Sequence, residues 1–167
     1  MKKLECSFCS YKLPEIPLCY AANAPYHYYV IAEEELESRT ELNKDFCVID
    51  NQFFFIRGNI EIPIIDSDEV FVWTVWVSLS ETNFLRANDL LLTEGRESEE
   101  PYFGWLSTEI SIYPTTVNLK TNVHTREVGL VPLIDLEPTD HPLAIEQRTG
   151  ITMERVKEFA HLIMHNQ

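Results

Sequence analysis

The sequence has few basic side chains for its length. Thirteen Lys and Arg residues stand against 27 Asp and Glu residues, which gives the 167-residue chain a formal net charge of −14. Such a charge repels nucleic acid and anionic membrane surfaces and favours basic partners. We therefore expect neither a nucleic-acid partner nor a membrane partner. An acidic surface most commonly serves solubility, and a role in recognition is the alternative.

Long apolar runs are also missing. The stretch from Met1 to Cys9 holds two Lys, one Glu and two Cys residues, so no export signal is expected there. No apolar run approaches the roughly 20 residues that are needed to cross a bilayer. These absences predict a soluble, cytoplasmic protein.

Cysteine is scarce, with four residues that we expect to be thiols or metal ligands rather than a disulfide framework. Cys6 and Cys9 have the spacing at which two thiolates can meet one metal ion. A structural zinc needs four ligands, and Cys19, His27 and Cys47 form no second pair. Cys19 and Cys47 could complete a four-thiolate site, but Cys47 lies in a predicted strand, where free cysteines pack as small hydrophobes. We predict no cofactor and no stoichiometric zinc.

The motifs of the common catalytic classes are absent: no serine elbow, HExxH pair, phosphate-binding glycine loop or dinucleotide fingerprint occurs. The most enzyme-like pair is Asp140–His141, because a histidine beside a carboxylate can act as a general base. Adjacent residues at a helix start rarely face each other, so we favour the alternative of a capping Asp and a packed or solvated His.

The most strongly patterned stretch runs from Glu69 to Ser80 and predicts a central β-strand. Nearly all of its residues are β-branched or aromatic, and neither Gly nor Pro interrupts it. Alternate side chains, with Trp73 on one face and Trp76 on the other, are apolar on both faces. Both faces of this strand should therefore be covered.

The neighbouring segments predict an antiparallel meander. Residues 46–49 and 53–56 are strand-like and are joined by a polar turn of hairpin length. The second run should continue past a glycine bulge or bend at Gly58 to about Ile64, before the central strand. Further strands are predicted within residues 102–106, 117–126 and 130–136.

Helices are predicted after the meander and at the end of the chain. Ser80 can cap a helix that runs to about Leu91. A second helix should begin near Pro142 with Thr139 or Asp140 as its cap, and a third should run from Met153 to about residue 165. Together these patterns predict an α+β fold, with a mainly antiparallel meander sheet packed by a few helices and with amphipathic helices at the C-terminus.

We expect one structural domain. Residues 1–45, rich in Cys, Pro and Tyr, should pack on an α+β body formed by residues 46–167. Tyr20, Tyr26, Tyr28 and Tyr29 give the first segment an adhesive surface, which more commonly covers a sheet than forms a binding face.

Several strings carry a family resemblance. They are FFIRG at 54–58, WVSLS at 76–80, FGWL at 103–106, LEPTDHPLA at 136–144 and EQRTGI at 146–151. Through them, and through the Cys6/Cys9 pair, the chain resembles the bacterial domain-of-unknown-function family 2199. Members of that family often have Gly directly after the second Cys, where this chain has Ser10. The resemblance implies no established activity.

Two functions follow as hypotheses. The first is a non-catalytic, protein-binding module that engages a basic partner, as an immunity or antitoxin-like protein would. The alternative is a small-molecule-binding protein or hydrolytic enzyme that uses His141 with Asp140 or Glu137 and an anion-holding Arg57 or Arg148, although both arginines could equally form structural ion pairs. The candidate ligand-binding residues are Arg57, Trp76, Trp105, His124 and Arg148.

Overall fold

A computed structural model describes residues 4–5, 12–13 and 16–165 of the chain. The first two elements, β1 (Leu4–Glu5) and β2 (Lys12–Leu13), form a short antiparallel pair. Cys6 and Cys9, the predicted metal-ligand pair, lie outside the described residues.

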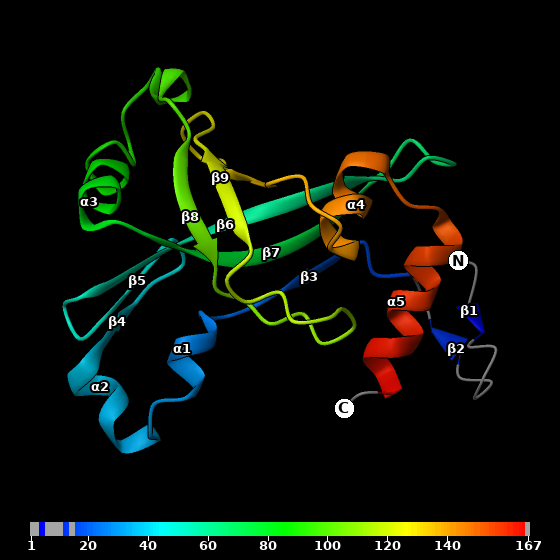
Figure 1. The fold of residues 1–167 in the computed structure, drawn as a ribbon, viewed down its shortest axis with the longest axis horizontal. Coiled ribbons are helices and arrows are strands. Elements are labelled where there is room, and N and C mark those ends of the chain that lie inside the picture. The colour runs from blue at the N-terminus through cyan, green and yellow to red at the C-terminus, as the bar shows by residue number, and fades with distance from the viewer. Residues whose placement is uncertain (1–3, 6–11, 14–15, 166–167) are drawn as a thin grey trace.

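Five strands form a closed barrel (Figure 1). In chain order they are β6 (Phe53–Pro63), β7 (Val70–Leu79), β8 (Tyr102–Leu106), β9 (Lys120–His124) and β10 (Leu133–Leu136). Each pairs with the next in antiparallel fashion, as the meander predicts, and β10 then closes the barrel by pairing with β6 in parallel. The predicted α+β fold with a mainly antiparallel sheet is confirmed.

Three more strands extend the barrel at its two longest members. The strand β5 (Phe46–Ile49) pairs antiparallel with the first half of β6, and β4 (Thr40–Leu42) pairs antiparallel with β5. The strand β3 (Cys19–Ala21) pairs in parallel with the first half of β7. One edge of β6 is thus shared by β5 and β10, and one edge of β7 is shared by β3 and β8.

The central strand β7 is apolar on both faces and is covered on both faces. Its inward side chains, including Phe71 and Trp73, are buried in the main core, and Trp76 is buried on the outer face. The strand continues past Gly58 as predicted, but without a bulge in its pairing with β7, because the two strands keep one constant register from Phe54 to Pro63. Gly58 instead gives room for Ile134 of β10, whose side chain occupies the position that a Cβ would need.

Two helices close the two ends of this core (Figure 1). Phe84 of α3 (Glu81–Asp89) packs its ring 5.2 Å from that of Phe46 at one end. Phe159 of α5 (Met153–His165) packs 5.0 Å from Phe71 and 5.3 Å from Trp73 at the other. Each helix therefore buries its apolar stripe where the strands leave the barrel open.

Side-chain caps fix the helix starts. Ser80 caps α3 as predicted, since its Oγ accepts a hydrogen bond from Asn83 N at 3.2 Å. The cap of α4 (Pro142–Thr149) is neither Thr139 nor Asp140 but His141, whose Nδ1 accepts from Leu143 N at 3.1 Å. Because Pro142 is the first residue of the helix, the capping position falls on the residue directly before it.

Residues 22–39, between β3 and β4, lie over the outer face of the sheet. They form α1 (Tyr26–Tyr29), the 3₁₀ turn η1 (Glu33–Glu35) and α2 (Leu36–Arg39), and a further 3₁₀ turn, η2 (Arg96–Ser98), follows α3. Ala22, Tyr28 and Ile31 pack on an outer cluster of Cys47, Ile49, Phe55 and Trp76. In the part of the chain that the structure describes, no helix is both long and apolar enough to span a bilayer.

Candidate functional site

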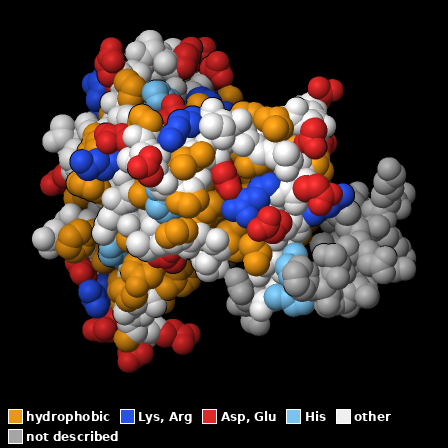
Figure 2. Space-filling model, turned by 45° about the vertical axis from the view of Figure 1, so that its right-hand side comes forward, with side chains coloured by type: hydrophobic (Ala, Val, Ile, Leu, Met, Phe, Trp, Pro, Cys, Tyr) orange, Lys and Arg blue, Asp and Glu red, His pale blue; other side chains and the backbone are white. Residues whose placement is uncertain are grey.

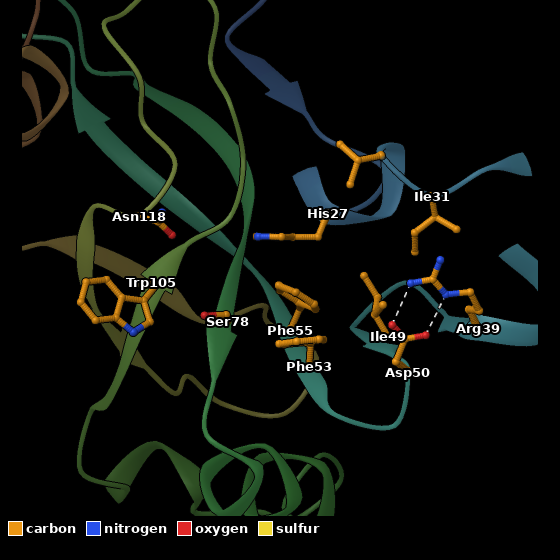
Figure 3. A pocket seen from close by; sticks show the side chains of 11 residues that line it. His27, Ile31, Arg39, Ile49, Asp50, Phe53, Phe55, Ser78, Trp105 and Asn118 are labelled. Carbon is orange, nitrogen blue, oxygen red and sulfur yellow. Dashed lines mark hydrogen bonds and ion pairs between the residues drawn. The ribbon is translucent and has the colours of Figure 1, made fainter. Parts of the chain in front are cut away.

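An open groove of about 580 Å³ lies on the outer face (Figure 3). We call it the aromatic groove. Its walls come from α1 and α2 on one side and from β8 on the other, with the β5–β6 hairpin as its floor. It is lined by His27, Val30, Ile31, Arg39, Ile49, Asp50, Phe53, Phe55, Ser78, Trp105 and Asn118.

Stacked rings form the floor of the groove. The His27 ring lies over Phe55 with 5.5 Å between ring centroids and 30° between planes. Partial burial of this ring lowers the pKa of His27, because loss of water disfavours the imidazolium. The neutral ring therefore presents an apolar face at neutral pH.

An ion pair holds one end of the groove. Arg39 donates from Nε and Nη2 to the two carboxylate oxygens of Asp50, both at 2.9 Å, and this hydrogen bonding lowers the pKa of Asp50. Asp50 and Asn51 have φ of 55° and 52°, the left-handed conformation that a tight hairpin requires. The turn thus aims Asp50 at α2, and the charge of Arg39 is neutralised.

Large apolar side chains are exposed along the groove. Phe53 and Trp105 line it with exposed fractions of 50% and 42%, and Tyr29 and Val30 stand at its α1 side with 62% and 66%. On β8 the inward residues are buried, so Trp105 and its neighbour Phe103 point outward, with ring centroids 5.1 Å apart. A contiguous surface of this kind marks a binding site more often than chance exposure.

The segment that builds the α1–α2 wall and the hairpin floor of the groove is rich in carboxylates. Residues 27–55 contain seven Asp and Glu residues against two basic ones, which gives the segment a net charge of −5. Figure 2 shows acidic side chains at the lower tip of the molecule, next to hydrophobic ones. Glu33–Glu35 are exposed and lie in the segment between α1 and α2. The groove is therefore mostly apolar within, and the segment that builds it has a net negative charge.

The two predicted tryptophans have different places. Trp105 lines the aromatic groove. Trp76 is 1% exposed, and its Nε1 donates to Ala22 O at 2.9 Å, so it ties residues 16–45 to the barrel. Trp76 supports the groove from behind and has no surface to offer a ligand.

The other predicted residues do not meet in one cavity. Arg57 lines a second cavity, between α3 and the loop before β10, which includes neither His124 nor His141. His124 of β9 pairs through Nε2 with Asp135 of β10 at 2.9 Å. The version of the small-molecule or hydrolytic alternative that uses Arg57 needs this arginine beside His141, and neither cavity contains both residues. The version that uses Arg148 stays a prediction.

His141 and Arg148 share a corner at the opposite end of β6. Besides capping α4, His141 places Nε2 3.0 Å from Pro114 O. Arg148 Nη1 donates to Thr139 O at 2.8 Å, and α4 leads into Ile151, whose N donates to Pro63 O. Both ring nitrogens of His141 are thus engaged by the backbone. Asp140, the carboxylate predicted to orient this histidine, precedes it as an exposed residue.

The thiols of Cys19 and Cys47 cannot share one metal ion. Cys19 lies opposite Val72 on β7, whereas Cys47 lies opposite Phe55, which itself lies opposite Ser78. Six strand residues separate Val72 from Ser78, about 20 Å along β7. Two thiolates on one zinc each lie about 2.3 Å from the ion. The four-thiolate arrangement is therefore excluded, while metal binding by the first two cysteines stays untested.

Cys47 behaves as the small hydrophobe that the sequence predicts. It is fully buried, and burial raises the pKa of its thiol to about 12. Among the described residues, no group of three or more His, Cys, Asp or Glu side chains is placed to hold a metal ion.

Several groove residues are missed by sequence reasoning. His27, Arg39, Asp50 and Phe53 belong to no recognised string and come from three segments that only the fold assembles. The available signal was the tyrosine-rich stretch before Val30, for which a binding face was the less favoured interpretation. Tyr28 does cover the sheet, whereas Tyr26 and Tyr29 remain exposed.

Comparison with known proteins identifies a family and nothing more specific. No curated protein matches the chain, and no solved structure matches it. A family model described as an uncharacterized protein conserved in bacteria matches residues 5–151, which include β1 through α4 and both cavities. The chain therefore belongs to the bacterial family DUF2199, as its sequence strings predict.

Proposed function

We propose that this protein is a non-catalytic binding module of the bacterial cytoplasm that receives a basic segment of a partner protein in the aromatic groove. An immunity or antitoxin-like protein would act in this way. The observation that carries the proposal is a mostly apolar groove of about 580 Å³ that is built by an acidic segment of the chain.

The groove has the composition of an interface centre. Exposed aromatic residues, here Phe53 and Trp105, are the side chains that contribute most to binding when they become buried against a partner. Arg39 is already neutralised by Asp50, so its charge does not oppose a basic partner, and the segment that builds the groove keeps a net charge of −5. A segment with Lys or Arg residues beside an apolar face fits this pattern.

The experiment is affinity capture of partner proteins from a bacterial lysate at low ionic strength. We expect a basic protein that is recovered with the wild type and released as salt is raised, because exposed charge pairs are screened. The double variant Phe53→Ser/Trp105→Ser should bind it more than tenfold more weakly, since both side chains are truncated at the interface centre.

Leu85→Ser is the matched control, because Leu85 is 49% exposed on α3, away from the groove. It should leave the affinity unchanged. Capture that survives the groove variant, or a partner that is acidic and insensitive to salt, would refute the proposal.

A further inference from the structure

The second cavity lies where β6 changes neighbours. One edge of β6 pairs with β5 as far as Ile56 and with β10 at Asn59, so β5 and β10 diverge around Arg57. Residues 44–46 before and in β5, residues 128–132 before β10, and the end of α3 enclose about 430 Å³ in this fork. The cavity shares no lining residue with the aromatic groove and is independent of the function proposed for it.

Its charge is opposite to that of the whole chain. Four of the thirteen basic residues line it, namely Lys44, Arg57, Arg96 and Arg126, against a single carboxylate, Asp45. In a chain of net charge −14 this is a local concentration of positive charge. An anion would be attracted to it.

Two of these cations are committed to the framework. Arg96 is buried and donates to four backbone carbonyl oxygens, those of Leu91, Arg126, Glu127 and Leu130, at 2.7–3.1 Å. Arg126 pairs with Glu61 at 2.9 Å and donates to Val131 O. These contacts fix the loop that forms the cavity wall, and they leave the remaining two cations for a ligand.

Arg57 and Lys44 have no such partners. The Nε of Arg57 is buried without a hydrogen-bond partner, and within residues 16–165 its guanidinium forms no ion pair. Lys44 is exposed and likewise forms no ion pair in that part of the chain. A buried donor without an acceptor costs free energy, and a ligand that supplies an acceptor to Arg57 would remove this cost.

Most of the remaining lining of the cavity is apolar, with Tyr102 and Thr125 as the other polar side chains. Phe46, Ile56, Leu91 and Val131 are among the side chains that line it. Its volume lies within the usual range of small-ligand sites, which combine apolar walls with a few polar groups that fix orientation. A simple inorganic anion would leave these walls without contact.

We propose that this cavity binds a small molecule with a carboxylate or phosphate group on an apolar body. The guanidinium of Arg57 receives the anionic oxygens, Lys44 adds a second positive charge at the mouth, and the apolar walls hold the body. A planar guanidinium suits both anions, because it can donate two parallel hydrogen bonds to either.

Isothermal titration calorimetry on the full chain tests this with four probes: octanoate and 2-naphthyl phosphate as anions, and octanamide and 2-naphthol as their neutral counterparts. We expect at least one anion to bind more than tenfold more tightly than its neutral counterpart, and the two pairs distinguish a carboxylate from a phosphate ligand. Anions that bind no better than their counterparts, or do not bind, overturn the proposal.

Variants locate the site. Arg57→Met should reduce the preference for the anion to under threefold, Arg57→Lys should retain part of it, and Lys44→Met should weaken it without abolishing it. Arg148→Met is the matched control, because among the described residues Arg148 bonds only to the backbone carbonyl of Thr139, at the other end of β6, and its loss should leave the preference intact. A preference that survives both Arg57→Met and Lys44→Met overturns the proposal, and circular dichroism confirms that each variant is folded.

Discussion

Replacing Trp76 by Phe tests how residues 16–45 are attached to the barrel. Trp76 is the largest fully buried side chain of the outer cluster, and its Nε1 bonds to Ala22 O. A phenyl ring keeps the aromatic character but cannot donate this hydrogen bond. The substitution therefore removes one defined link between β7 and the segment that builds one wall of the aromatic groove.

The expected cost has two parts. Loss of the hydrogen bond to Ala22 O should cost about 1–2 kcal/mol. The smaller ring leaves part of the indole volume empty, and the resulting void should cost about another 1–2 kcal/mol. Trp76→Phe should therefore lower the free energy of unfolding by about 2–4 kcal/mol, the range of a substantial core substitution.

Urea unfolding of three proteins measures this: the wild type, Trp76→Phe and Trp105→Phe. The same chemical change at Trp105, which is 42% exposed, should cost no more than about 0.5 kcal/mol. Amide hydrogen exchange should also become faster at Tyr28 and Ile31 in Trp76→Phe alone. Equal destabilisation by the two substitutions, or unchanged exchange in Trp76→Phe, would refute the assignment of Trp76 as the anchor.

Three further predictions concern other parts of the chain. Gly104→Ala should destabilise the protein by about 1–3 kcal/mol in urea unfolding, because a Cβ at this position would lie 2.6 Å from the backbone oxygen of Ser78. Hydrogen bonds from Arg86 and Tyr102 lower the pKa of Glu99 to about 2. The stability that the charged carboxylate provides is therefore present above its ordinary pKa of 4.5 and is lost as pH falls toward 2. NMR titration should show that the pKa of Glu99 rises in Arg86→Gln. Metal analysis of protein purified without chelator should find no stoichiometric zinc, and about one zinc per chain that disappears in Cys6→Ser would contradict this.

Local patterns in the sequence predict most of the elements. The run from Glu69 to Ser80 is apolar in both alternating sets, which only a strand covered on both faces can satisfy, and β7 is such a strand. The polar turn around Asn51 separates two runs of matching length, and those runs pair as β5 and β6. The amphipathic spacing of Val156 and Phe159 predicts α5, and both residues are buried. Each of these signals lies within one short window.

The closure of the barrel is not contained in any such window. The parallel contact of Leu133 with Asn59 joins segments more than 70 residues apart, and no turn chemistry precedes it. The parallel pairing of Cys19 with Val72 joins segments more than 50 residues apart. Gly58 was interpreted as a bulge or bend within β6, whereas its missing side chain makes room for Ile134 of β10.

The candidate sites escape sequence reasoning for the same reason. The long strands β6 and β7 each pair with two different strands along one edge, and a cavity lies where one partner strand ends and the next begins. Beside β6 this is the cavity around Arg57, and beside β7 it is a smaller cavity of about 270 Å³, between β3 and β8. The residues around such a cavity come from segments that are distant in sequence and that meet because they pair with successive parts of one strand. Arg57 could be singled out because it belongs to the string FFIRG, whereas Lys44 precedes β5 and Arg126 lies between β9 and β10, and neither has a mark in the sequence. Strands that exchange neighbours are therefore the places in this fold where polar side chains are the first candidates for functional tests.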